Sequence, residues 1–119
     1  MKRVQAIIRP DFLEPLKDAV LASQIGGMTV SSVHGCGNQS GWKEYFRGNE
    51  VIMNILPKIK CEFVVNDDMV EDVIDIVCST CRTGQVGDGK IFVSGVQDVM
   101  RVSTGEMGMA ALNMEEEIA

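Results

Sequence analysis

The chain has 119 residues, of which 17 are Asp or Glu and 11 are Lys or Arg, so its formal net charge is −6. With 45% apolar and 24% charged residues it has the balance of one globular domain, spanning residues 1–119, which excludes a disordered or collagen-like chain. The acidic balance argues against non-specific binding to nucleic acid or to an anionic membrane surface.

The N-terminal segment contains an apolar run that is too short for the core of a signal peptide, and no small-residue cleavage site follows it. Nowhere does the chain contain the run of roughly 18 apolar residues that a membrane-spanning helix needs. We therefore expect a cytoplasmic protein whose four cysteines remain thiols.

A strand, a helix and a second strand are predicted in the first part of the chain. Residues 4–8 are β-branched and apolar, which predicts a strand buried on both faces or nearly so. A helix is expected to begin at the capping pair Asp11 and Glu14 and to end at the glycines 26–27. Residues 28–33 then predict a second strand.

The segment 35–57 shows no clear periodicity, and a segment of this length in a compact domain is usually functional. It holds three of the six aromatic residues and two cations, namely Trp42, Lys43, Tyr45, Phe46 and Arg47. Such a cluster on a loop is typical of a protein-binding hot spot. The alternative is the tip of a long β-hairpin whose aromatic side chains pack on their own domain.

The pattern of strand, helix and strand returns in the second half. Residues 59–65 predict a strand, residues 69–81 carry a helical apolar stripe, and Gly84 is expected to end that helix. Residues 90–93 predict another strand, and residues 99–102 fit a short extra one.

An internal duplication explains this repetition, because a shift of 57 residues places residues 3–27 over residues 60–84. Two such units predict an α+β, ferredoxin-like double βαβ domain with an antiparallel sheet and both helices on one face. We expect the other face to be rich in Ile, Val and Met and therefore to be covered by other subunits.

The glycine-rich segment from Gly84 to Lys90 satisfies GxxxxGK, the first part of a P-loop motif. Ile91 stands where a P-loop needs Ser or Thr, and the segment follows a helix and precedes a strand, the reverse of P-loop order, so a P-loop NTPase is excluded. Backbone N–H groups beside a lysine can still hold phosphate oxygens. A phosphate cradle and a plain glycine-rich turn both remain open.

Cys78 and Cys81 form a CxxC pair. Redox-active pairs lie where a helix begins, because the helix N-terminus lowers the thiol pKa, whereas this pair falls late in its predicted helix. We favour small buried hydrophobic residues. The alternatives are a redox centre and a zinc site, which would need further ligands from Cys36, Cys61 and His34.

The sequence carries little that points to an enzyme. His34 is the only histidine, no Ser or Cys nucleophile has a second base nearby, and no carboxylate pair is placed for acid–base chemistry.

Several segments carry motifs of a known family. They are Ala6-Ile7-Ile8-Arg9-Pro10, Gly27-Met28-Thr29-Val30, Tyr45-Phe46-Arg47-Gly48, Leu56-Pro57-Lys58-Ile59-Lys60, Thr104-Gly105-Glu106 and Thr83-Gly84-Gln85-Val86-Gly87-Asp88-Gly89-Lys90-Ile91-Phe92-Val93. Along nearly its whole length the chain resembles the P-II nitrogen-regulatory signalling proteins. The resemblance implies a ferredoxin-like homotrimer with a T-loop at about 37–55, a B-loop at about 83–89 and a C-terminal loop at about 102–119.

The resemblance also implies a regulator without catalytic residues. Family members bind ATP or ADP in clefts between subunits, and 2-oxoglutarate through Mg²⁺ beside ATP. Their T-loop engages a target protein such as an ammonium channel, a glutamine-synthetase regulator or a nitrogenase regulator. Membrane association would therefore be peripheral, through such a target.

Functional positions carry over residue by residue. The nucleotide-binding positions of the family match Thr29, Gly37, Gln39, Glu62, Val64, Gly87, Asp88, Gly89, Lys90 and Arg101. Gln39 would also orient Mg²⁺, and together with Gly41 and Lys58 it would bind 2-oxoglutarate.

Four positions depart from the family pattern. Asn38, Ser40 and Ser103 stand where basic residues are usual, and charge-assisted hydrogen bonds contribute on the order of 1.5–3 kcal/mol each. We therefore expect weakened nucleotide binding or a lost preference for ATP over ADP. Val51 replaces the tyrosine that many bacterial members have uridylylated, so no uridylylation is expected. The alternative function is a degenerate P-II-like interaction trimer with weakened or lost nucleotide sensing.

Overall fold

The computed structural model describes residues 1–36, 43–46, 49–52 and 55–112, and the side chains of 1–36 and 55–112. Its elements in chain order are β1 (Lys2–Ile8), the 3₁₀ turn η1 (Pro10–Phe12), α1 (Leu13–Leu21), β2 (Thr29–Cys36), β3 (Lys43–Phe46), β4 (Asn49–Ile52), β5 (Ile55–Val65), the 3₁₀ turn η2 (Asp67–Met69), α2 (Val70–Cys81), β6 (Lys90–Gly95) and α3 (Met109–Leu112).

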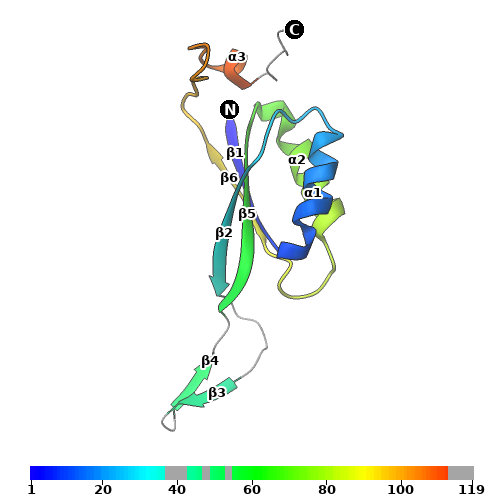
Figure 1. Ribbon diagram of the computed structural model, residues 1–119, viewed down its shortest axis with the longest axis vertical. Coiled ribbons are helices and arrows are strands. Elements are labelled where there is room, and N and C mark those ends of the chain that lie inside the picture. The colour runs from blue at the N-terminus through cyan, green and yellow to red at the C-terminus, as the bar shows by residue number, and fades with distance from the viewer. Residues whose placement is uncertain (37–42, 47–48, 53–54, 113–119) are drawn as a thin grey trace.

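Four strands form one antiparallel sheet in the order β2-β5-β1-β6. Helices α1 and α2 lie side by side on one face of it, as Figure 1 shows. Strands β3 and β4 pair separately as a two-stranded antiparallel sheet. The predicted α+β ferredoxin-like architecture is confirmed.

The core lies between the sheet and the two helices. Side chains alternate along β1, so that Val4, Ala6 and Ile8 are buried beneath the helices while Gln5 and Ile7 are half-buried on the opposite face. The strand is thus fully buried on the helix-covered face and half-buried at Gln5 and Ile7 on the other, which is close to the predicted burial on both faces or nearly so. The other core members come from the same face of the sheet and from the helices: Leu16, Val20, Ile25, Cys61, Phe63, Val65, Val73, Val77 and Cys81.

The duplication is visible in the structure. The turns η1 and η2 begin 57 residues apart, at Pro10 and Asp67, and α1 and α2 also begin 57 residues apart. The same shift superposes buried positions of the two helices, because Leu16 corresponds to Val73 and Val20 to Val77. The chain therefore contains the same unit of strand, 3₁₀ turn and helix twice, once in each half.

The helices begin without the predicted side-chain caps. The backbone N–H of Phe12 donates to the carbonyl of Arg9 at 3.1 Å, which closes a 3₁₀ turn ahead of α1. Glu14 forms an ion pair with Lys17 at 2.7 Å instead of returning to the helix start. The capping pair proposed for Asp11 and Glu14 is thus wrong, because the 3₁₀ turn satisfies the backbone at this end.

Both helices also end earlier than their glycines indicate. After α1, the hydroxyl of Ser23 donates to the carbonyl of Val20 at 2.6 Å and accepts the N–H of Ile25 at 3.1 Å. This side-chain turn ends the helix at Leu21, five residues before Gly26. Similarly, α2 ends at Cys81, ahead of Gly84.

The face of the sheet away from the helices is mixed in character, which corrects the expectation of a face rich in Ile, Val and Met. The register aligns Arg3 with Val64, Gln5 with Glu62, and Ile7 with Lys60. Because side chains alternate between faces, the helices cover most of the large aliphatic residues of these strands.

Beyond β6 the chain forms a turn in place of the short strand predicted at 99–102. Met100 and Met107 form an isolated antiparallel bridge, and the N–H of Gly108 donates to the carbonyl of Val99 at 3.0 Å. Among the residues described, no helix is long and apolar enough to cross a membrane.

Candidate functional site

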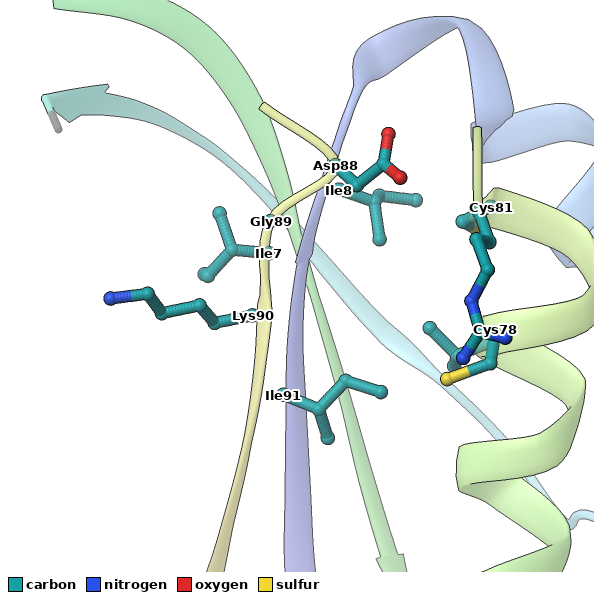
Figure 2. Close-up of a pocket in the computed structure, with 10 residues that line it drawn as sticks. Ile7, Ile8, Cys78, Cys81, Asp88, Gly89, Lys90 and Ile91 are labelled. Atoms are coloured by element: carbon teal, nitrogen blue, oxygen red, sulfur yellow. The ribbon is translucent and has the colours of Figure 1, made fainter. Parts of the chain in front are cut away.

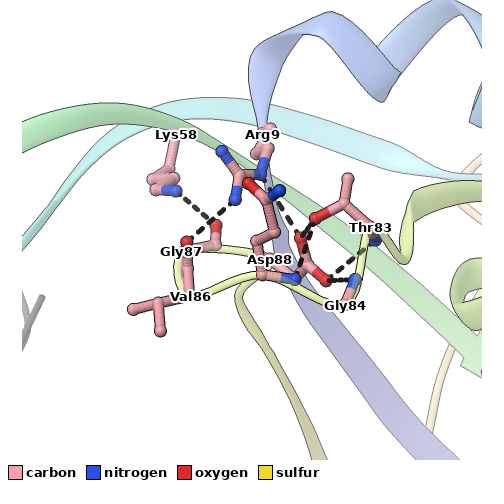
Figure 3. Close-up of polar contacts among 8 residues, drawn as sticks. Arg9, Lys58, Thr83, Gly84, Val86, Gly87 and Asp88 are labelled. Carbon is pink, nitrogen blue, oxygen red and sulfur yellow. Dashed lines mark hydrogen bonds and ion pairs between the residues drawn. The ribbon is translucent and has the colours of Figure 1, made fainter.

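The B-loop, residues 83–89, joins α2 to β6 and is organised around the carboxylate of Asp88 (Figure 3). The N–H groups of Thr83 and Gly84 each donate to Asp88 Oδ2 at 2.9 Å, and the Thr83 hydroxyl donates to Oδ1. Arg9 Nε lies 3.4 Å from the same oxygen. The Thr83 hydroxyl first, and then these N–H donors and Arg9, hold the pKa of Asp88 down at about 2.

Three glycines give this loop its path. Gly84, Gly87 and Gly89 have φ values of +84°, +103° and +99°, which L side chains rarely adopt. At Gly89 a Cβ atom would lie 1.6 Å from the carbonyl oxygen of Ile7, whereas at Gly84 it would meet nothing within 4 Å. Gly89 is therefore required both by its backbone conformation and by its close approach to β1.

Two cations contact the loop, Lys58 of β5 and Arg9, the residue that follows β1. Arg9 Nη2 donates to the carbonyl of Val86 at 2.9 Å, and Lys58 Nζ donates to the carbonyl of Gly87 at 2.6 Å. Lys58 is only 8% exposed, and its burial, with the nearby Arg9 charge as a second cause, lowers its pKa. Such a pair of adjacent cations is a favourable place for an anionic ligand.

A cavity of ≈ 280 Å³ lies between α2 and the β6 edge of the sheet. Asp88, Gly89 and Lys90 form one wall of it, and Cys78 and Cys81 of α2 form the opposite wall (Figure 2). The side chain of Lys90 extends away from α2, towards the uncovered face of the sheet.

A larger cavity of ≈ 650 Å³ lies at the β2 side of the sheet. It is lined by Arg3, Gly26, Gly27, Met28, Thr29, Glu62, Val64, Arg101, Ala111 and Leu112. Within it, Glu62 Oε1 accepts a hydrogen bond from Gln5 Nε2 at 2.9 Å and lies 3.3 Å from Lys60 Nζ. Gln5 first and Lys60 second lower the pKa of Glu62, so this wall carries a fixed negative charge.

Arg101 is positioned by the turn that follows β6. Its backbone N–H donates to the carbonyl of Glu106 at 2.8 Å, and Gly105, at φ +75°, lets the chain reverse between them. The guanidinium lies 3.5 Å from the carboxylate of Glu106 and donates to the carbonyl of Ala111 at 3.3 Å. Arg101 therefore ties the C-terminal segment to the wall of the larger cavity.

The structure divides the predicted nucleotide residues into two groups. Thr29, Glu62, Val64 and Arg101 line the larger cavity, whereas Asp88, Gly89 and Lys90 line the smaller one, with Gly87 next to them in the B-loop. The edge strands β2 and β6 are separated by β5 and β1, so Thr29 and Lys90 are more than about 14 Å apart, at three strand spacings of about 4.8 Å. Within one chain the two groups therefore lie at two separate cavities.

Some of the predicted residues cannot be placed. Gly37, Gln39, Gly41, Trp42 and Arg47 lie outside the described residues, as do Asn38 and Ser40. Lys43, Tyr45 and Phe46 belong to β3, whose side chains are not described. The predicted Mg²⁺, 2-oxoglutarate and partner contacts at these positions therefore stay predictions.

Sequence reasoning missed the roles of Arg9 and Thr83. Arg9 meets the B-loop across 77 to 79 residues of chain, and no local pattern signals such a contact. Thr83 had a signal, because a Thr followed five residues later by Asp in a glycine-rich segment is typical of a side-chain-capped turn. The predicted role of Asp88 in nucleotide binding stays a prediction; in the structure its carboxylate accepts hydrogen bonds from Thr83 and Gly84 within its own loop.

The cysteines are all free thiols. Cys61 and Cys81 are buried, as predicted for small hydrophobic residues, and burial raises the pKa of both to about 11. Cys78 is only partly buried and faces the smaller cavity. In the part of the chain that the structure describes, no three His, Cys, Asp or Glu side chains are placed to hold a metal ion, so nothing there favours the zinc alternative.

Comparison with known proteins identifies the family. The family model described as "Nitrogen regulatory protein P-II" matches residues 1–106. The "Nitrogen regulatory protein P-II 2" of Methanothermobacter thermautotrophicus is 47% identical over 112 residues, covering 94% of this chain and 97% of the relative. The "Nitrogen regulatory protein P-II" sequences of Porphyra purpurea and Klebsiella oxytoca are each 46% identical, over 94% of this chain and all of the relative.

The chain therefore belongs to the P-II family of nitrogen regulatory proteins, as its motifs predicted. Membership supports a signalling role in nitrogen regulation. P-II proteins are regulatory signalling proteins rather than enzymes. The sequence likewise contains few residues that point to an enzyme.

Proposed function

We propose that the protein is a homotrimeric, ligand-gated regulator that binds ATP or ADP between subunits and acts on nitrogen-metabolism targets through its T-loop. The observation that carries the proposal is the division of the nucleotide residues into two half-sites. Thr29, Glu62, Val64 and Arg101 form one, and Gly87, Asp88, Gly89 and Lys90 form the other. A neighbouring copy would bring the second half-site to the first and complete the pocket.

The chemistry of the B-loop supports phosphate binding. The left-handed conformations of Gly84, Gly87 and Gly89 let the backbone approach a ligand closely. Asp88 lies in the same loop, but its negative charge is balanced by Thr83, Gly84 and Arg9. Lys90 supplies a cation beside this loop, and Arg101 would supply another from the neighbouring subunit.

The cluster of Lys58 and Arg9 supports 2-oxoglutarate binding. Burial first and repulsion from the Arg9 charge second lower the pKa of Lys58, so a carboxylate placed between the two cations would stabilise both. Lys58 would then exchange its bond to the carbonyl of Gly87 for one to the distal carboxylate. Gln39 and Gly41 would complete the site, with Gln39 also orienting the Mg²⁺ that supplies positive charge between the nucleotide and the keto acid.

The change of hydrogen-bond partner at Lys58 would couple ligand binding to the conformation of the T-loop, which would contact the target. Release of the Gly87 carbonyl changes the B-loop, and the T-loop leaves β2 at the sheet end where Gly35 packs against Lys58. Ligands shift such a loop only as far as their affinities for its states differ. The T-loop would then contact a cytoplasmic target protein, or the cytoplasmic face of a membrane protein, through Trp42, Lys43, Tyr45, Phe46 and Arg47. Such targets are an ammonium channel, a glutamine-synthetase regulator or a nitrogenase regulator.

Titration calorimetry with ATP and with ADP tests the proposal. Lys90→Ala and Arg101→Ala should each weaken binding by about 10- to 150-fold, because each removes a charge-assisted hydrogen bond worth about 1.5–3 kcal/mol. Lys17→Ala is the matched control, since Lys17 pairs with Glu14 on α1 and should leave affinity unchanged. Equal affinities for wild type and both variants would contradict the proposed site.

A degenerate interaction trimer is the second candidate, and Ser103 favours it. This exposed serine lies two residues beyond Arg101, where the family usually has another cation. A rise in unfolding temperature with millimolar ATP or ADP would count against this candidate, and its absence would favour it. If the missing cation acts only on the triphosphate, ATP and ADP should bind with similar affinity.

A further inference from the structure

Cys78 and Cys81 occupy the last turn of α2, three residues apart and therefore on one face of the helix. Both line the cavity of ≈ 280 Å³ whose opposite wall is Asp88 and Gly89 of the B-loop (Figure 2). A thiol pair thus faces the loop that forms the phosphate cradle.

The two thiols differ in accessibility. Cys78 is partly exposed at the cavity, so a reagent from solvent reaches it. Cys81 is 4% exposed, and burial raises its pKa to about 11, so a reagent meets Cys78 first. The order of access therefore makes Cys78 the attacking cysteine and Cys81 the resolving cysteine, and the raised pKa of Cys81 slows the resolving step. Arg82 lines the same cavity and offers a positive charge to an anionic reagent.

The backbone links this pair to the B-loop over two residues. The N–H of Arg82 donates to the carbonyl of Cys78 at 3.1 Å and closes the last turn of α2. The next residue, Thr83, donates two hydrogen bonds to the carboxylate of Asp88, one from its N–H and one from its hydroxyl. A disulfide needs Cβ atoms about 3.5–4.5 Å apart, whereas helix neighbours at this spacing lie about 5–6 Å apart. The turn must therefore deform, and Thr83 must move with it.

We propose that Cys78 and Cys81 form a reversible intramolecular disulfide by exchange with low-molecular-weight disulfides, and that its formation loosens the hold of Asp88 on Thr83 and Gly84. Cys78 loses its proton to solvent, and its thiolate attacks one sulfur of the reagent and breaks the S–S bond; the departing thiolate takes up a proton and leaves as one thiol, and a mixed disulfide remains on Cys78. The Cys81 sulfur then attacks Cys78 Sγ and breaks the mixed disulfide, and its proton passes to the departing thiolate, which leaves as the second thiol. Two protein thiols are oxidised and one reagent disulfide is reduced to two thiols.

Oxidised glutathione is the probe for the exchange. The parent protein carries Cys36→Ser, because Cys36 is exposed and would react on its own. After treatment, thiol counting in denaturant should find one thiol in place of three, and the intact mass should show no glutathione adduct. Because the pair sits at a helix C-terminus, which does not stabilise a thiolate, the reaction should take minutes to hours.

Two variants in the Cys36→Ser background resolve the steps. Cys81→Ala should accumulate one glutathione adduct, because the mixed disulfide has no partner to resolve it, and Cys78→Ser should show neither adduct nor thiol loss. Three remaining thiols in the treated parent, or an adduct that persists on the parent, would overturn the proposed pair.

Amide hydrogen exchange tests the effect on the B-loop. The amides of Thr83 and Gly84 both donate to Asp88 at 2.9 Å, so oxidation should make them exchange at least several-fold faster, and dithiothreitol should restore the slow rate. The amides of β1 serve as the internal control. Unchanged exchange at Thr83 and Gly84 in protein that carries the disulfide would overturn the coupling. None of these readouts requires nucleotide binding.

Discussion

Gly89 shows how a single hydrogen atom shapes the site. An alanine there would place its Cβ 1.6 Å from the carbonyl oxygen of Ile7 and adopt a φ of +99°, so both packing and backbone oppose it. Gly84→Ala is the matched control, since φ is +84° but the space is open. We expect Gly84→Ala to lower the free energy of unfolding by about 1–2 kcal/mol, and Gly89→Ala by at least about 2 kcal/mol more.

Denaturant unfolding of both variants measures this difference. Equal losses would mean that the close approach of Gly89 to β1 contributes nothing to stability, contrary to the structure. A larger loss of unfolding free energy for Gly89→Ala would show that the packing of the B-loop on β1 stabilises it in addition to the hydrogen bonds of Asp88 within the loop.

The carboxylate of Asp88 predicts a pH dependence. Its pKa is lowered from 3.8 to about 2 in the folded protein. A lowered pKa means that the group stabilises the fold fully above its unfolded pKa, and that this contribution disappears as the pH falls from about 4 to about 2. Asp88→Asn should therefore be less stable than wild type at neutral pH, and the gap should close over this window.

Chemical unfolding of wild type and Asp88→Asn at a series of pH values measures that gap. The comparison cancels the other acidic groups whose pKa values are also lowered, such as Glu62 and Asp67. A gap that stays constant from neutral pH to the acid end of the series would contradict the role of Asp88 as an ionised organiser of the loop.

At the scale of the element, α1 provides the clearest contrast between its two faces. Leu16 is fully buried against the sheet, whereas Leu21, five residues on, is 75% exposed. Leu16→Ala should lower the free energy of unfolding by about 2–5 kcal/mol, and Leu21→Ala should change it by less than about 0.5 kcal/mol. Thermal or denaturant unfolding measures both, and a comparable loss for the two would contradict the placement of α1.

Elements could be predicted from the sequence where local pattern and repetition agree. The apolar stripe of α2 and the 57-residue repeat predicted β1, α1, β2, β5, α2 and β6 in the observed order, whereas the strand expected at 99–102 is a turn. The ends of the helices could not be predicted from glycines 26–27 and 84. Hydrogen bonds of the Ser23 hydroxyl with Val20 and Ile25 end α1 before its glycines, and α2 ends where Arg82 adopts an extended backbone conformation. A glycine signals the stop more strongly in the sequence, but these residues come earlier along the chain.

Features that depend on strand register were beyond the sequence. The uncovered face was expected to be aliphatic, yet the pairing of Gln5 with Glu62 and of Ile7 with Lys60 makes it mixed. Likewise, the meeting of Arg9 and Lys58 with the B-loop joins segments far apart in the chain. The family resemblance, in contrast, named Thr29, Glu62, Val64 and Arg101 of the larger cavity and Asp88, Gly89 and Lys90 of the smaller one without any knowledge of their geometry.

At the scale of the whole molecule, a chain with a net charge of −6 has the cations of its proposed sites in small groups. Lys58 and Arg9 hold the B-loop, Lys90 lies beside it, and Arg101 lies at the other cavity. An acidic protein can thus bind anionic ligands locally while remaining unsuited to polyanions such as nucleic acid. The separation of these groups within one chain is the reason for proposing that each site is shared.

Co-assembly of two defective variants tests that claim most directly. Lys90→Ala and Arg101→Ala chains, expressed separately, should each bind ATP weakly at every site. Expressed together, random assembly should pair an intact Lys90 half-site with an intact Arg101 half-site at about a quarter of the interfaces. Calorimetry should then find tight ATP binding at about that fraction of sites, whereas no recovery on co-assembly would show that each nucleotide site belongs to one chain.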